Sequence, residues 1–168
     1  MIADVENAMI AALAAAAPVR VVDSVPAGFD LKEAERRLRL APALYVAFEG
    51  GRLRAETDAI LDADFQVFVL THSASGEKAR RLAAYQLVEQ VIAALHNLAL
   101  PGLGTLAAHD VKNLYAASLD DQGLSLYSVR FALALSVPAT LSLADWITLT
   151  ATWNETVTDT LTLPPQGS

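Results

Sequence analysis

The most regular pattern in the chain is LSLYSVRFALALSV, residues 124–137, in which apolar side chains recur at every second position from Tyr127 onward. A period of two residues is that of a β-strand, because successive side chains point to opposite faces of a sheet. One predicted face is apolar, with Tyr127, Val129, Phe131, Leu133, Leu135 and Val137; the other carries Ser128, Arg130 and Ser136. Such a strand needs partner strands and a layer over its apolar face, so we expect a sheet with helices packed on it.

Other segments also have the pattern of strands. VRVVDSV, residues 19–25, is short, whereas ALYVAFEGGRLRAE, residues 43–56, alternates well and contains Gly50-Gly51, which is typical of a tight hairpin turn. DFQVFVLTH, residues 64–72, is apolar on both faces and is therefore expected in the centre of the sheet. VKNLYAASL, residues 111–119, is expected to pair with residues 124–137 around a turn at 120–123.

Three segments have helical spacing. Residues 1–17 form an ordinary first helix and not a secretion signal, because their charged side chains are acidic, and Pro18 ends the helix. Residues 30–42 form a second helix, which Asp30 and Glu33 can begin as a capping box. A third, long helix begins near Ser75, which is expected to be its cap.

The fold class expected from these elements is α+β: a mostly antiparallel sheet packed by one long helix and two shorter helices, with a C-terminal β-hairpin arm. Residues 1–137 are expected to form the α+β domain, and residues 138–168 a Thr-rich extension. This extension has no Lys or Arg, eight Thr and both Trp of the chain, and it alternates strictly on either side of a turn at 154–156. Because a lone hairpin is barely stable in water, it must lie either on its own domain or on a neighbouring subunit.

The long helix has an unusually wide apolar arc. Residues 85, 88, 92, 95 and 99 fall together at 100° steps, and residues 87, 91, 94 and 98 extend the same side. Roughly half of the helix circumference is therefore apolar, which is wider than packing on one sheet requires. We expect the helix to meet a second surface as well. An apolar fraction of 54% for the whole chain also suggests surface that is buried between subunits.

Nothing in the sequence makes a convincing catalytic, cofactor-binding or metal-binding site. The chain has no cysteine, and His72, His96 and His109 lack the spacing of a helical metal pair. His109 and Asp110 are expected in a loop as a solvated pair. We interpret His96 as a neutral histidine at the rim of the apolar arc, bonded to a backbone carbonyl and lying at the edge of an interface.

Charge and hydropathy also limit the possible partners. The formal net charge of −7 argues against broad attraction to nucleic acid, and no apolar run reaches the ~20 residues of a membrane span. The second helix carries a basic cluster, which is most simply a solvated face and alternatively a docking surface for an acidic neighbour: Lys32, Arg36, Arg37 and Arg39.

The segments APALYVAFEGG, then FQVFVLTHSASGEKARRLAAYQLVEQVIAALHNLALPGLG, then LYSVRFAL, in this order, resemble the Mu-like phage and prophage tail terminator family. The resemblance covers residues 1–137 and leaves the Thr-rich end unmatched. It implies a non-enzymatic virion protein without cofactors, which assembles in the host cytoplasm as a ring, usually of six subunits, at the neck-proximal end of a contractile tail. Its implied partners are its own copies and the tube, sheath and neck proteins, with DNA only passing through the lumen and no membrane contact.

A ring needs a heterologous interface, in which one face of a subunit meets a different face of the next. The candidate interface residues are Leu87, Val91 and Leu98 on the outward side of the long helix, and Trp146 and Trp153 in the hairpin. The turn Asp120-Asp121 is a candidate contributor to an acidic lumen. Two alternatives stay open: another neck or tail-completion ring protein, and a small enzyme or ligand-binding module with a discrete pocket near His96 or His109.

Overall fold

A computed structural model describes residues 1–29, 31–55, 59–72, 76–114 and 123–137. The chain divides into two units after Val137, and everything described here concerns the first of them. The elements along this first unit are α1 (Ile2–Ala16), β1 (Val21–Ser24), α2 (Leu31–Arg36), the 3-10 turn η1 (Leu38–Leu40), β2 (Ala43–Ala55), β3 (Ala59–His72), α3 (Glu77–Leu95), β4 (Ala99–Leu100), β5 (Gly104–Thr105), β6 (Ala107–Asn113) and β7 (Leu124–Val137).

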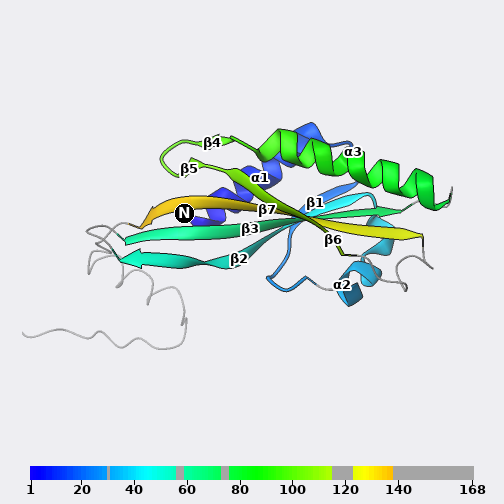
Figure 1. Cartoon of the computed structure of the whole chain (residues 1–168), viewed down its shortest axis with the longest axis horizontal. Coiled ribbons are helices and arrows are strands. Elements are labelled where there is room, and N and C mark those ends of the chain that lie inside the picture. Colours follow the sequence, from blue (N-terminus) through cyan, green and yellow to red (C-terminus); the bar gives the residue numbers. More distant parts are fainter. Residues whose placement is uncertain (30, 56–58, 73–75, 115–122, 138–168) are drawn as a thin grey trace, which may run out of the picture. The chain divides into compact units, whose positions relative to one another are not determined.

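Five of the strands form one sheet in the order β1-β2-β3-β7-β6, and β4 and β5 form a separate two-stranded sheet. β1 runs parallel to β2, and the other pairs in the large sheet are antiparallel. Figure 1 shows α1 and α3 together over one face of this sheet and α2 on the opposite side. The expected α+β class with a mostly antiparallel sheet is confirmed, as is the central place of residues 64–72, which belong to β3.

The main core lies between the sheet and the two helices α1 and α3. β7 contributes the apolar face predicted for it, and α1 contributes Val5, Met9 and Leu13, as its spacing predicts. α3 contributes Ala84, Leu87, Val88, Val91 and Leu95. The wide apolar arc of α3 therefore has an explanation inside this chain, because α3 packs against both the sheet and α1. The expectation that the width marks a subunit contact does not follow.

A smaller core lies on the other face of the sheet, under α2. It joins Ala34 of α2 to Phe29 and to strand residues that include Tyr45 and Phe68. The Phe29 ring lies 5.4 Å from that of Tyr45 and 4.7 Å from that of Phe68, measured between centroids. The second core covers only part of this face, and the rest of the face carries polar side chains.

The hairpin turn predicted at Gly50-Gly51 is wrong, because β2 continues through both glycines to Ala55. The strand has a β-bulge between Phe48 and Gly50, and Gly50 has a φ of 112°, which favours glycine. A Cβ at Gly51 would lie 2.5 Å from the backbone oxygen of Asp62, so the neighbouring strand excludes a side chain there. The two glycines serve a bulge and a close strand contact, and β3 begins at Ala59, earlier than predicted.

Other boundaries also differ from the sequence prediction. His109 and Asp110 lie in β6 and not in a loop, and a β-bulge falls between Ala108 and Asp110. The N-cap of α3 is Gly76. The predicted caps Asp30 and Ser75, the turn residues 120–122 and the whole Thr-rich hairpin lie outside the described residues.

Candidate assembly surfaces

The structure does not leave the proposed α3 interface residues free for a second subunit. Val91 is fully buried and Leu87 is 6% exposed, both within the main core. Leu98 is half-buried and packs against the same core. This corrects the prediction that they form the outward side of the helix, since Leu87 and Val91 are buried in the core of their own chain and Leu98 lies beyond the end of α3. Trp146 and Trp153 lie outside the described residues.

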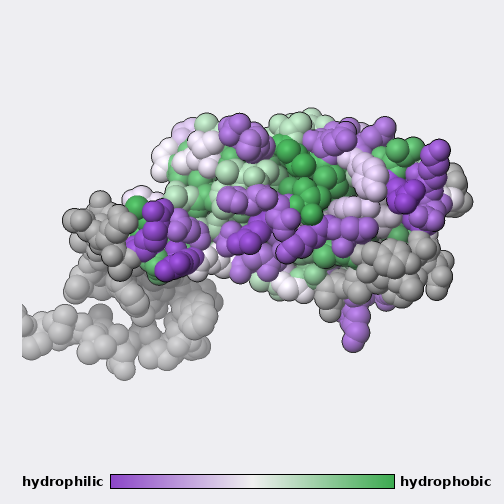
Figure 2. Space-filling view, viewed as in Figure 1, coloured by the Kyte–Doolittle hydropathy of each residue, from purple (hydrophilic) through white to green (hydrophobic). Residues whose placement is uncertain are grey.

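The outward surface of α3 contains a different apolar pair, Leu82 and Tyr85, which are 53% and 45% exposed. The Tyr85 ring meets Tyr127 of β7 edge-on, with 5.8 Å between centroids, and burial raises the pKa of the Tyr127 phenol. Figure 2 shows hydrophobic surface along the boundary between α3 and β6, beside a row of hydrophilic residues. Exposed apolar side chains that cluster in this way are typical of interaction surfaces.

The two outer edges of the sheet carry further exposed aliphatic side chains. Val111 on β6 is 45% exposed and Leu53 on β2 is 64% exposed. Neither was predicted as a surface contact. Leu53 stands between Arg52 and Arg54 just after the glycine pair, and interpreting those glycines as a turn concealed that β2 continues as an edge strand.

The sheet face opposite α1 and α3 has an open, charged half. Arg130 of β7 binds the carboxylate of Asp64 on β3 with two hydrogen bonds, of 2.7 Å and 3.1 Å, and Arg54 binds Asp62 at 2.8 Å. A shallow hollow of about 270 Å³ is lined by Glu49, Asp64, Gln66, Asp110, Lys112, Ser128 and Arg130. Since exposed ion pairs each stabilise a fold by only about 0–1 kcal/mol, these pairs contribute little to holding the sheet together.

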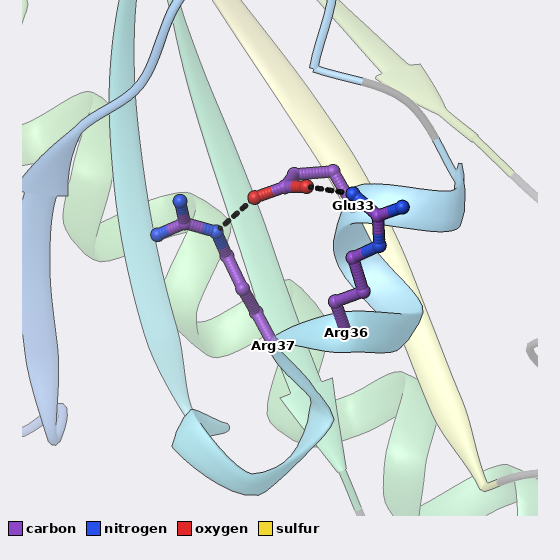
Figure 3. Close-up of polar contacts among 3 residues, drawn as sticks. All are labelled: Glu33, Arg36 and Arg37. Atoms are coloured by element: carbon purple, nitrogen blue, oxygen red, sulfur yellow. Dashed lines mark hydrogen bonds and ion pairs between the residues drawn. The ribbon is translucent and has the colours of Figure 1, made fainter.

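The basic cluster on the second helical segment is only partly a solvated face. Figure 3 shows Glu33 between two arginines: its carboxylate accepts a 2.8 Å hydrogen bond from Arg37 Nε and lies 3.4 Å from a terminal nitrogen of Arg36. The Arg37 guanidinium also lies 4.8 Å from the centre of the Tyr45 ring. Arg37 therefore covers Tyr45 at the edge of the smaller core, while Lys32, Arg36 and Arg39 are exposed.

The histidines do not come together. His96 is the C-cap of α3, and its Nδ1 accepts a 3.1 Å hydrogen bond from the Ala108 amide, so its partner is a backbone N–H and not the expected carbonyl. This bond ties the end of α3 to the start of β6. His72 and His109 are exposed, and no group of three acidic or histidine side chains among the described residues could hold a metal ion. No helix in the described ranges is both long and apolar enough to cross a membrane.

The chain is similar to known proteins in sequence and in fold. A family model described as "Bacteriophage Mu, Gp37" matches residues 1–135. The "Mu-like prophage FluMu protein gp37" of Haemophilus influenzae is 27% identical over 140 residues, which cover 82% of this chain and 72% of that protein. A chain in the solved structure titled "Virion of native gene transfer agent (GTA) particle" has a similar fold, with a TM-score of 0.50, 20% identity, and coverage of 79% of this chain and 92% of that one.

Proposed function

We propose that this chain, which belongs to the bacteriophage Mu Gp37 family, is a structural virion protein: the tail terminator of a contractile tail. It forms a ring of six copies at the head-proximal end of the tail, ends the growth of tube and sheath, and joins the tail to the neck. The observation that carries the proposal is the family match, which extends over residues 1–135 and so includes nearly the whole described fold. The fold shared with a chain of a virion structure is compatible with it.

The surface chemistry supports assembly. A closed ring requires two different complementary faces on each subunit, and exposed apolar side chains lie on α3 and β6 and, on the other side of the sheet, on the open edge of β2. The formal charge of −7 suits a channel through which DNA slides, because an acidic surface does not hold phosphates.

The alternatives predict different observations. A ligand-binding module or enzyme would need a discrete pocket with convergent polar groups that are available to a ligand. In the hollow on the sheet, Asp64 already binds Arg130, and Asp110 lies 3.3 Å from Lys112, so much of the lining is engaged within the chain. Another neck or tail-completion ring protein would share the assembly chemistry and differ in its place in the particle.

Two measurements test the proposal. Native mass spectrometry of the purified full chain is expected to give a closed oligomer of six copies, and a stable monomer over a wide concentration range would count against any ring. Electron microscopy of the intact particle is expected to place the ring where tube and sheath end below the head. A ring found elsewhere in the neck would reject the terminator role and support the neck alternative.

A further inference from the structure

The large sheet ends in two open edges on opposite sides of the molecule. β6 is the last strand on one side. On the other side β1 covers β2 only from Ala43 to Val46, and among the described residues no strand pairs with the outer edge of β2 beyond that point. We propose that β6 of one copy pairs with the segment Gly50–Ala55 of β2 in the next copy, which joins the sheets of neighbouring subunits into one barrel. The proposal rests on the ring inferred above.

The strand directions fit this junction. β2, β3, β7 and β6 alternate in direction across the sheet, since each neighbouring pair is antiparallel. In a ring whose copies are related by rotation, β6 of one copy and β2 of the next therefore run in opposite directions. The junction is an antiparallel ladder, and the alternation continues around the ring without interruption. Both strands have regular backbone at the junction. The bulge of β6 lies before Asp110, and the bulge of β2 lies before Gly50.

The side chains on the two edges also match face to face. Val111 pairs across the sheet with Val129, and Leu53 with Leu61, so both exposed aliphatic side chains belong to the face that carries α1 and α3. Placing Val111 opposite Leu53 would shield from water two apolar groups that are now 45% and 64% exposed.

In this register the other face also contains a complementary pair, because Asp110 comes opposite Arg54. Lys112 then comes opposite Arg52, which is a like-charge pair. The carboxylate of Asp62, the cross-strand neighbour of Arg52, already binds Arg54 at 2.8 Å. The opposite-charge contact and the like-charge contact offset each other, so the register is selected by the aliphatic contact between Val111 and Leu53 and not by charge.

The stagger of this register is that of a closed barrel. Val111 pairs with Val129 of β7, which pairs with Val67 of β3, whereas Leu53 pairs with Leu61 of β3. These two positions on β3 are six residues apart. Each copy would thus be displaced along the strands by roughly 20 Å relative to the next, across four strands that span roughly 19 Å. The resulting strand tilt of about 45° lies at the upper end of the range that barrel closure requires.

Cysteine cross-linking tests the junction, because the chain contains no cysteine. Val111 and Leu53 of one copy are separated by three strand spacings, about 14 Å, across the sheet and by roughly 20 Å along the strands, which is too far for a disulfide within the chain. The double variant L53C/V111C is therefore expected, on mild oxidation of the assembled full chain, to give a ladder of covalent oligomers that ends at the closed ring. Each single variant is expected to stay monomeric on a non-reducing gel.

A matched control separates the junction from random collision. L40C/V111C carries two cysteines at similarly exposed sites, since Leu40 is 40% exposed, and it is expected to give no ladder. Rings seen by native mass without the L53C/V111C ladder would reject the strand junction and leave the proposed function standing. A native monomer would reject the ring itself. Dimers from V111C alone would show a symmetric β6–β6 contact and overturn the head-to-tail arrangement.

Discussion

At the scale of the residue, Gly51 shows why β2 tolerates no side chain at that position. An alanine Cβ there would meet the Asp62 oxygen at 2.5 Å and the Ala63 Cα at 3.1 Å, and both atoms belong to the backbone of the central strand. We expect Gly51→Ala to lower the free energy of unfolding by about 1–3 kcal/mol, as overpacking does in a core. Urea denaturation measures this. The exposed neighbour variant Glu49→Ala should change stability by less than about 0.5 kcal/mol, and equal values for the two variants would contradict the close strand contact.

Glu33 provides a residue-scale test of the contact that seals the smaller core. Hydrogen bonding from Arg37, and then the charges of Arg37 and Arg36, lower the pKa of the Glu33 carboxyl. A lowered folded-state pKa contributes stability above the unfolded pKa, and this contribution is lost as the pH falls through the folded pKa. Arg37→Met is therefore expected to raise the pKa of Glu33, followed by NMR of its carboxyl carbon, with a smaller rise in Arg36→Met. The reverse order would show that Arg36 is the main partner.

At the scale of the element, α3 distinguishes a core helix from an interface helix. Leu87 faces the main core and Leu82 faces outward on the same helix. Leu87→Ala is expected to cost about 2–5 kcal/mol of unfolding free energy through the cavity it leaves, whereas Leu82→Ala should cost little. The cost at Leu87 should not depend on protein concentration, because the contact lies within one chain. A strongly concentration-dependent cost in urea titrations would restore Leu87 to the subunit interface.

Elements with a single strong period were predictable from the sequence, and ambiguous glycines were not. β7 occupies the predicted residues 124–137, and the α1 stripe is buried as its spacing indicates. Gly50-Gly51 fits both a hairpin turn and a bulge, and only the partner strand decides between them. The apolar arc of α3 is as wide as predicted, but its width does not indicate a subunit contact. Sequence spacing does not reveal that α1 lies beside α3.

At the scale of the whole molecule, the assembly surfaces could not be read from the sequence in the same way. An interface residue such as Val111 or Leu53 is an apolar residue in a strand, like many core residues, and only the topology shows that its strand lies at an edge. The family resemblance suggested a ring, which the strand order then connects to two particular edges. The family resemblance therefore supports the ring, and the strand order supports the two edges proposed to join its subunits.

The last prediction concerns assembly of the whole ring. Leu53→Asp places a carboxylate opposite Val111 in the proposed junction, and burying that charge without a partner is costly. We expect it to reduce the oligomer seen by native mass spectrometry and to leave the circular dichroism of the subunit unchanged, because Leu53 is 64% exposed in the single chain. Leu40→Asp, the control at an exposed leucine away from both edges, should assemble normally. Combining Leu53→Asp with Val111→Lys supplies an opposite charge across the junction and should recover part of the oligomer. If the combination recovers no oligomer, the contact lies on other residues.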